Sequence, residues 1–308
     1  MAKIYDMLII GGGPGGYTAA LYAARAGLSV LVLEKLSAGG QMALTSQIDN
    51  YPGFPEGIDG FELGERMQQQ AERFGAETEY AQVEKADLLA DPKVVDSSEG
   101  RFLAKTVVIA TGANARKLGL DKEDALVGRG VAYCAACDGM FYRGKTVVVV
   151  GGGDSAAAEA LLLSRIAKKV IVVHRRDSLR ATKIYHEPLI RAENVEFLWN
   201  SGVSRLLSDG RVRGAVVRNA RSGEETEVAV DGIFVSIGRV PATALVAGQL
   251  ELDEGGYVVA DETTETNIPG VYAVGDVRTK LVRQVVTAVA DGAAAVHMAE
   301  EYLAGGAT

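Results

Sequence analysis

The stretch of sequence that decides the fold is "MLIIGGGPGGYTAALYAARAGLSVLVLEK", residues 7–35. Its first apolar run predicts a buried strand, and the alanine-rich segment after the glycines predicts a helix. A second apolar run then ends in Glu34. Strands that are apolar throughout are typical of a parallel sheet covered on both faces. Gly11, Gly13 and Gly16 lie at the strand-to-helix turn, so the stretch predicts a βαβ unit of the dinucleotide-binding type.

The same pattern occurs a second time in "KTVVVVGGGDSAAAEALLLSRIAKKVIVVHRR", residues 145–176. Here Gly151, Gly153 and Ala156 take the three turn positions, and the second apolar strand ends in basic residues. At 308 residues the chain exceeds the usual size of one domain. The repeated unit therefore predicts two α/β domains.

The segments around the two units predict how the domains are connected. A strand at residues 101–113 returns to the first sheet, and a long helix runs from about Arg283 to Leu303. The other expected elements are a helix at 61–75, strands within 77–89, an antiparallel meander at 203–218 and 226–235, and a strand at 270–276. The predicted fold class is α/β with two Rossmann-like domains of the three-layer ββα type. One comprises residues 1–114 and 245–308, and the other, residues 115–244, is inserted into it.

The residues that end the second strand of each unit distinguish the two sites. A carboxylate at Glu34 accepts hydrogen bonds from the hydroxyls of an unphosphorylated ribose, as in FAD. The second unit instead ends in "HRRDSLR", which supplies His174, Arg175, Arg176 and Arg180. Guanidinium groups bind a 2′-phosphate with paired hydrogen bonds, which favours NADPH. The two sites together predict a flavoprotein that takes hydride from NADPH; the alternatives are a phosphate-free turn and a solvated basic run.

Composition and charge disfavour several other classes of protein. The net charge of −8 argues against nucleic acid or an anionic membrane as the main partner, because both attract a basic surface. No secretory signal and no apolar run of about 20 residues is recognised, so we expect a cytoplasmic protein and no membrane partner. Zinc requires about four ligands, and the two cysteines and three scattered histidines of this chain are few candidates for such a site. We therefore predict no metal site.

The two cysteines of the chain lie in "GVAYCAACDGMFYRGK", residues 130–145. The spacing of Cys134 and Cys137 brings them within one helical turn, close enough to form a disulfide. In the cytoplasm such a pair is more often catalytic or metal-binding than structural. Asp138 is a candidate proton carrier for the sulfur that attacks or leaves. The alternative is that both cysteines are small buried side chains.

The full series of motifs resembles the low-molecular-weight thioredoxin reductases. The resemblance rests on "GGGPGGYTAALYAAR", "GGQM", "NYPGFP", "VVIATGA", "CAACDG", "VVGGGDSAAAEA", "HRRDSLRA", "PGVYAVGDV" and "RQVVTAVADGAAAVHMAEEYL", in this order over essentially the whole chain. It implies an NADPH-dependent flavoprotein that reduces the disulfide of thioredoxin and that forms a homodimer. FAD would bind to the first domain and NADPH to the inserted one.

The resemblance also implies roles for particular residues. FAD is expected to contact Gly11, Gly13, Pro14, Gly16, Glu34, Lys35, Gly40, Gln41, Asn50, Thr111, Gly112, Gly275, Asp276, Arg283, Gln284 and Val285. For the last three the alternative role is capping and packing of the long helix. NADPH is expected to contact Gly151, Gly152, Gly153, Asp154, Ser155, His174, Arg175, Arg176 and Arg180.

In this family the second cysteine, here Cys137, faces the flavin, and the first, Cys134, attacks the external disulfide. Asp138 matches the acid–base residue. Arg129, Met140 and Phe141 are candidates for docking thioredoxin beside the cysteines, although core packing explains the two apolar residues equally well.

The order of the motifs raises a geometric problem. The cysteine pair and the NADPH turn lie in the same inserted domain, and both must reach a flavin held by the other domain. We therefore expect this domain to rotate between two arrangements, with hinges at 112–119 and 236–243.

Other functions stay open on the residues alone. The same construction serves a peroxiredoxin-reducing subunit, a glutaredoxin-like substrate, a dithiol oxidase or a redox sensor without turnover. The intact "HRRDSLR" argues against the oxidase, because an oxygen-driven enzyme does not need NADPH.

Overall fold

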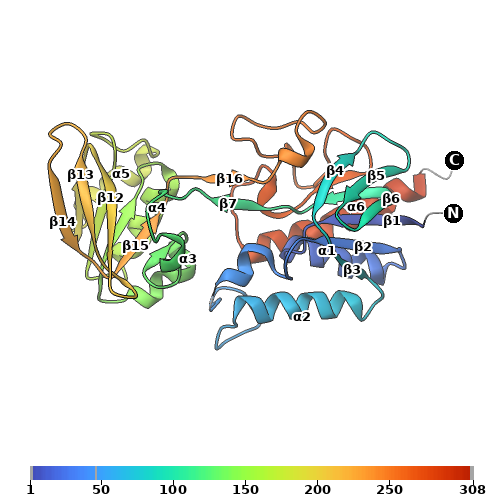
Figure 1. The fold of residues 1–308 in the computed structure, drawn as a ribbon, viewed down its shortest axis with the longest axis horizontal. Coiled ribbons are helices and arrows are strands. Elements are labelled where there is room, and N and C mark those ends of the chain that lie inside the picture. The colour runs from blue at the N-terminus through green and yellow to red at the C-terminus, as the bar shows by residue number, and fades with distance from the viewer. Residues whose placement is uncertain (1–2, 46, 306–308) are drawn as a thin grey trace. The chain divides into compact units, whose positions relative to one another are not determined.

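The computed structural model describes residues 3–45 and 47–305, which divide into two compact units (Figure 1). The first unit contains the chain up to Asn114 and again from Val240 onward, and the second runs from Ala115 to Arg239. The second boundary falls earlier than the expected 244/245 junction. The reason is that the amide of Ala242 donates a hydrogen bond to the carbonyl of Gly112 at 2.9 Å, and the hydroxyl of Thr243 donates to the carbonyl of Gly256 at 2.9 Å. At the two crossings, β7 (Ala113–Ala115) pairs with β16 (Arg239–Pro241).

A single sheet organises the first unit. Its strand order is β3 (Glu77–Tyr80), β2 (Val30–Glu34), β1 (Ile4–Ile10), β6 (Gly100–Ile109), β5 (Lys93–Ser97) and β4 (Val83–Asp87), and β17 (Val271–Ala273) also pairs with β6. β1 is parallel to β2 and β6, with Ile10 opposite both Leu33 and Ile109. These three strands therefore end at one edge of the sheet, where Gly11 and Glu34 lie.

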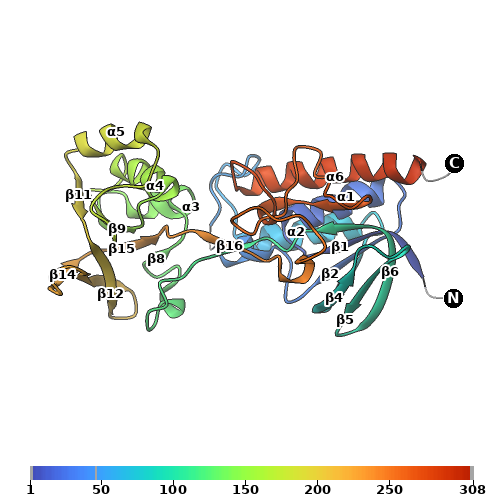
Figure 2. The same cartoon turned by 90° about the horizontal axis from the view of Figure 1, so that it is seen from above.

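Helices cover one face of this sheet. These helices are α1 (Pro14–Arg25), α2 (Gly60–Glu72) and α6 (Val285–Gly305) (Figure 2). They bury mostly small side chains against alternate residues of β1 and β2, such as Met7 and Val32. The intervening strand residues, such as Leu8 and Leu33, face a second core. This two-sided burial explains why the strands read as continuous apolar runs. Proline at the first position of α1 starts that helix without losing a hydrogen bond.

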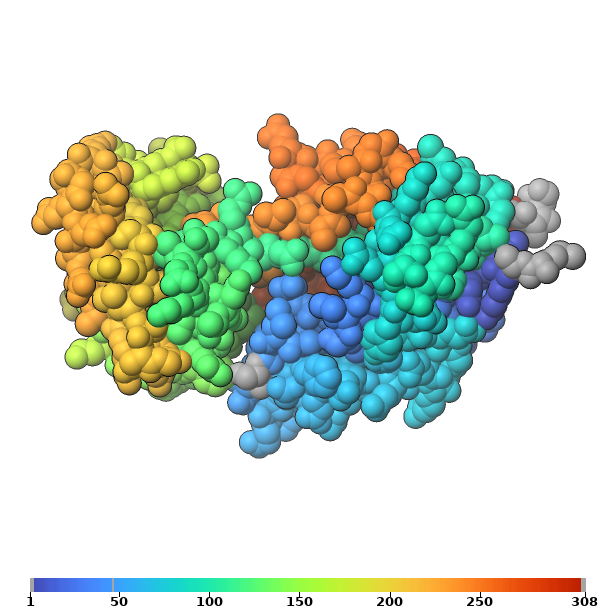
Figure 3. Space-filling model, in the orientation of Figure 1, coloured from blue at the N-terminus to red at the C-terminus, as the bar shows by residue number. Residues whose placement is uncertain are grey.

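The second unit has three layers. Its parallel sheet has the order β11 (Val195–Leu198), β10 (Lys169–Val173), β9 (Thr146–Val150), β15 (Gly232–Val235) and β8 (Val131–Ala132). One face packs against α3 (Ala135–Asp138), α4 (Asp154–Ser164) and α5 (His186–Arg191). The other packs against the antiparallel strands β12 (Ser201–Ser208), β13 (Val212–Asn219) and β14 (Glu225–Ala229), shown in yellow and orange on the surface in Figure 3. The predicted ββα layering of this unit is confirmed.

Three details of the expected element pattern are corrected. Residues 226–235 do not form one meander strand: β14 joins the antiparallel sheet, whereas β15 is buried at every position and pairs in parallel with β8 and β9. The strand β5 was not expected. The last helix begins at Val285 rather than at Arg283. Across the described residues, no helix is both long and apolar enough to cross a membrane.

Candidate functional site

The turn between β1 and α1 leaves an open helix N-terminus. A Cβ atom added to Gly16 would lie 2.0 Å from the carbonyl oxygen of Gly11, so only glycine permits this close approach of helix to strand. No side chain caps α1, and a Cβ atom at Gly13 would meet nothing within 4 Å. The first amides of the helix therefore have no side-chain acceptor, and they are suited to the oxygens of a diphosphate.

Glu34 lies next to this turn. One of its carboxylate oxygens accepts a hydrogen bond from the amide of Gly12 at 2.6 Å, and the other accepts from the amide of Leu36 at 3.0 Å. Each oxygen keeps a lone pair that can accept a hydrogen bond from a ribose hydroxyl. Gly39 donates to the carbonyl of Gly12 at 2.8 Å, and this bond holds the segment that starts η1 (Gly40–Leu44) beside the turn. Gln41 belongs to η1, whereas Lys35 lies exposed just after β2.

The other residues expected to bind FAD lie at three places in the first unit. The amide of Asn50 donates to the side-chain oxygen of Gln284 at 3.1 Å, so these two distant positions are brought together. Thr111 donates to the carbonyl of Ala242 at 2.8 Å, and Gly112 follows it with a left-handed φ of 70°. Val285 packs beside the small apolar cluster that contains Met42.

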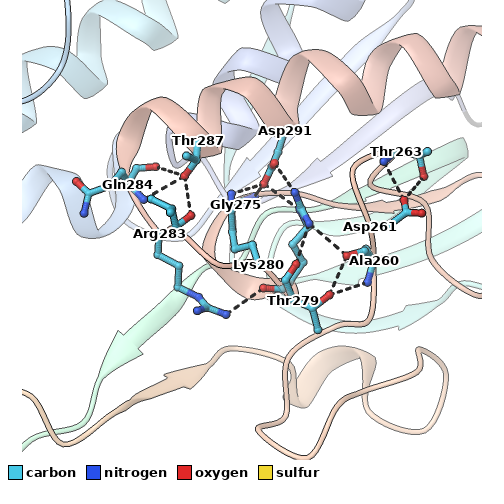
Figure 4. A network of polar contacts seen from close by, with 12 residues as sticks. Ala260, Asp261, Thr263, Gly275, Thr279, Lys280, Arg283, Gln284, Thr287 and Asp291 are labelled. Atoms are coloured by element: carbon cyan, nitrogen blue, oxygen red, sulfur yellow. Dashed lines mark hydrogen bonds and ion pairs between the residues drawn. The ribbon is translucent and has the colours of Figure 1, made fainter. Parts of the chain in front are cut away.

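A buried ion cluster holds the turn after β17. The carboxylate of Asp291, on α6, accepts hydrogen bonds from the amide of Gly275 at 2.8 Å and from Lys280 at 2.7 Å (Figure 4). Arg278 donates to both oxygens of the same carboxylate, at 3.0 and 2.7 Å. The side chains of all three charged residues are at most 10% exposed. The cluster therefore anchors Gly275 and Asp276, in η6 (Gly275–Val277), to the long helix.

None of the three charged residues was singled out from the sequence. The available signal was an acid, Asp291, within the otherwise apolar stretch "AVADGAAAV". A buried carboxylate needs partners, but the sequence does not say which cations supply them.

Arg283 lies just before α6, and only part of its guanidinium group has partners. The group lies 4.1 Å from the ring centroid of Tyr257, and one terminal nitrogen donates to the carbonyl of Arg278 at 3.3 Å. Its Nε atom is buried and has no hydrogen-bond partner in the described structure. A buried donor without an acceptor is costly, so this atom is suited to an acceptor on a bound cofactor.

The second glycine turn is covered by the basic loop that follows β10. Gly151 has a left-handed φ of 147°, and a Cβ atom there would lie 2.2 Å from the carbonyl oxygen of Ser236. The backbone amide of Arg180 donates a hydrogen bond to the carbonyl of Gly152 at 2.7 Å, and the backbone amide of Thr182 donates one to the carboxylate of Asp154 at 2.6 Å. The loop is thus fixed beside the N-terminus of α4, which has no side-chain cap.

Within this loop, the arginines and His174 have different environments. Arg175, Arg176 and Arg180 are exposed, and the guanidinium of Arg180 lies 3.8 Å from the position of a Cβ atom on Gly153. Ser155 is also exposed at the start of α4. This group of cations at an uncapped helix N-terminus is suited to a phosphorylated nucleotide.

His174 lies beneath the turn instead. It is 6% exposed, and its ring occupies the space where a side chain on Gly152 would lie. Burial lowers the pKa of His174, and the neighbouring arginines lower it further. The ring therefore favours the neutral form, and the geometry gives it the task of supporting the glycine turn rather than that of a fourth cation.

The cysteine pair follows the edge strand β8 of the same sheet. Cys134 and Cys137 form a disulfide with a Cα–Cα distance of 5.3 Å. Cys134 is the N-cap of the short helix α3, and its sulfur accepts a hydrogen bond from the amide of Cys137 at 3.2 Å. Both residues are half-buried. The spacing argument is confirmed, because the two sulfurs lie within one turn and are bonded.

Asp138 ends α3 directly after the second cysteine. Burial raises the pKa of its carboxyl group to about 6. A carboxyl with such a pKa exchanges a proton in the neutral range, which is the property that an acid–base residue requires.

The residues after α3 are divided between core and surface. Tyr142 is buried and packs edge-on against Phe234, with ring centroids 5.1 Å apart. Met140 and Phe141, in the same 3₁₀ turn (Gly139–Tyr142), are 50% and 42% exposed, and Arg129 is also exposed. Core packing therefore does not explain the two apolar side chains.

Comparison with known proteins agrees with this arrangement. The family model described as pyridine nucleotide-disulphide oxidoreductase matches residues 5–292. A thioredoxin reductase of Streptomyces clavuligerus is 47% identical over 307 residues, which covers 99% of this chain and 95% of the relative. The crystal structure of thioredoxin reductase from Streptococcus pyogenes MGAS5005 superposes with a TM-score of 0.91 at 44% identity, covering 99% of this chain and all of that one.

A further solved relative differs in overall superposition. The thioredoxin reductase of Lactococcus lactis, in the conformation that its description calls FR, is 42% identical and covers 98% of this chain and 99% of that one, but the TM-score is 0.70. Identity of this order over nearly the full length establishes relationship as well as fold. The chain therefore belongs to the pyridine nucleotide-disulphide oxidoreductases and, within them, to the thioredoxin reductase family.

Proposed function

We propose that this protein is an NADPH-dependent flavoenzyme that reduces the disulfide of thioredoxin. The observation that carries the proposal is the Cys134–Cys137 disulfide, half-buried at the start of a short helix in the same unit as the basic glycine turn. Relatives named thioredoxin reductase, similar over nearly the whole chain, support the choice of substrate. A cytoplasmic location and a homodimer stay predictions from the sequence.

The two glycine turns are assigned to different cofactors. We assign FAD to the first, because Glu34 offers acceptors for ribose hydroxyls and a net positive cluster anchors Gly275. We assign NADPH to the second, because Arg175, Arg176 and Arg180 are exposed beside an uncapped helix. When bound, FAD carries the two electrons of the NADPH hydride to the disulfide.

The cysteines then pass these electrons on by thiol–disulfide exchange. The thiolate of Cys134 attacks one sulfur of the thioredoxin disulfide; a mixed disulfide forms, and the other thioredoxin sulfur leaves and takes a proton. Cys137 attacks Cys134, which re-forms the internal disulfide and releases the second thioredoxin thiol. Two electrons and two protons have then reached thioredoxin. Met140, Phe141 and Arg129 supply an exposed surface at which a protein substrate can dock.

Replacement of either cysteine tests the proposal directly. Cys134→Ser and Cys137→Ser should each abolish NADPH-dependent reduction of oxidised thioredoxin, because each removes one sulfur of the exchange. Reduction of ferricyanide by NADPH, which does not need the dithiol, should persist in both variants. The measurement is NADPH consumption with thioredoxin, run beside glutathione disulfide, a peroxiredoxin and oxygen alone as acceptors. Undiminished thioredoxin reduction by the Cys134 variant would contradict the proposal.

Removal of the exposed arginines should change the preference for the nucleotide. In Arg175→Gln with Arg180→Gln, we expect KM for NADPH to rise at least tenfold, since hydrogen bonds to a charged group contribute about 1.5–3 kcal/mol each. KM for NADH should change little, because NADH has no 2′-phosphate. Arg221→Gln is the matched control: this arginine is also exposed and pairs with Asp177 of the same loop. An equal loss with both nucleotides would mean that the arginines do not recognise the phosphate.

The pKa of Asp138 predicts how the exchange depends on pH. Cleavage of the internal disulfide needs a proton at the leaving sulfur, and a carboxyl with a pKa of about 6 is increasingly deprotonated as the pH rises above that value. The rate of disulfide reduction should therefore fall from pH 6 to pH 8. In Asp138→Asn it should be lower by about 10²-fold and should lose this pH dependence. Stopped-flow reduction at a series of pH values measures both effects, and a variant that keeps the wild-type profile would refute the role of Asp138.

The order of the motifs also requires a movement. We propose that the inserted domain rotates so that nicotinamide and disulfide reach the flavin in turn, because both belong to this domain and the flavin is assigned to the other. A bifunctional lysine cross-linker that joins the domains should stop steady turnover but preserve one half-reaction. The monofunctional form of the reagent is the control. Full turnover in the cross-linked protein would exclude the rotation.

A further inference from the structure

A second acidic residue of the inserted domain lies near the redox pair. Glu159 is on α4, the helix that begins at the NADPH turn, and it is half-buried between this helix and α3. Neither the cofactor assignments nor the proposed exchange uses this residue. A carboxylate in such a place is costly unless its oxygens accept hydrogen bonds, so its partners indicate what it does.

Glu159 joins two segments that are distant in the sequence. Its carboxylate accepts a hydrogen bond from the hydroxyl of Ser236, the residue that follows β15. It also accepts a hydrogen bond from the backbone amide of Ala135, which is the first residue of α3 and lies between the cysteines. Ser236 is itself fixed, because its amide donates to the carbonyl of Val150 at 2.8 Å. One carboxylate thus connects the start of α3, the short helix that contains Cys137, to the end of β15, in the sheet that carries the second glycine turn.

The charges around Glu159 are few. Burial raises its pKa most, and repulsion by Asp138 adds to this effect, whereas Ser236, the Ala135 amide and Arg239 lower it. Two hydrogen-bond donors and one cation thus face the carboxylate, against one acid. The two donors and the cation each lower the pKa of Glu159 and thus oppose the effect of burial.

We propose that Glu159 is a positioning residue of the redox centre: it fixes the amide of Ala135, between the two cysteines, at the start of α3, and its acidic group tunes the reactivity of the Cys134–Cys137 pair. The inference rests on the proposed function of that pair. It adds a determinant of dithiol reactivity that belongs to the NADPH-binding helix rather than to the CxxC motif.

The expected effect has a definite direction. A nearby negative charge disfavours a thiolate, and a destabilised thiolate makes the dithiol a stronger reductant. Glu159→Gln keeps the shape and one acceptor but removes the charge. The more reactive thiol should therefore ionise at lower pH, and the dithiol should become less reducing.

Two measurements on the holoenzyme test this. With the disulfide reduced by dithiothreitol, the rate of alkylation by iodoacetamide at pH 7 should rise about threefold to tenfold in Glu159→Gln, and its pH profile should shift to lower pH. In dithiothreitol redox buffers, the dithiol–disulfide equilibrium should shift towards the dithiol by a similar factor. A tenfold shift corresponds to about 30 mV for this two-electron couple. Reduction of the flavin by NADPH and the temperature of unfolding should stay near their wild-type values.

A second variant and a control keep the test independent of misfolding. Ser236→Ala removes one donor to the same carboxylate and should alter both thiol measurements, and the double variant should differ from the sum of the two single effects because the groups are coupled. Glu187→Gln is the matched control, since this glutamate is 69% exposed and pairs with Arg191 on α5. If both Glu159→Gln and Ser236→Ala keep the wild-type rate of thiol alkylation and the wild-type dithiol–disulfide equilibrium, this inference is wrong but the proposed function is not affected. Thioredoxin reduction without Cys134 would instead overturn the proposed function.

Discussion

The close approach of backbone to backbone at the two glycine turns is the constraint on which the rest of the structure depends. At Gly16 and at Gly151 a side chain would lie within 2.0 and 2.2 Å of a carbonyl oxygen. Since only glycine fits, each helix starts directly at the end of a central strand, and neither helix has a side-chain cap at its N-terminus. The acid, the arginines and the redox helix are all positioned relative to these two turns.

Most of the architecture could be predicted because it follows from local patterns. The two βαβ units have continuous apolar strands and glycines at fixed spacing, and the cysteine spacing requires no tertiary information. The prediction for β15 is wrong, because a short buried strand has the same sequence pattern whether its partners are parallel or antiparallel. Tertiary packing, rather than the local sequence, determines that β15 joins the parallel sheet, because all four of its residues are buried there.

The residues that the sequence did not predict are those whose roles depend on distant partners. Asp291 acts through Arg278 and Lys280, which lie outside its helix, and Glu159 acts through Ser236 and Ala135. His174 adjoins the arginines in the sequence, but its ring is buried against Gly152 whereas the arginines are exposed. Proximity in sequence identifies a loop, whereas burial decides which of its side chains reach a ligand.

The second unit combines two tasks that are usually considered separately. Its sheet presents the basic loop after β10 and the redox helix after the edge strand β8, and α4 contacts both: it begins beside the loop, and its Glu159 reaches the amide of Ala135. If nucleotide binding shifts α4, the hydrogen bond from Ala135 to Glu159 would therefore also displace the start of α3. The cysteine pair and the nucleotide site are consequently connected through one helix of the same compact unit. This connection is the reason why we propose a movement of the whole unit, rather than a local rearrangement of the CxxC segment, for the alternation between them.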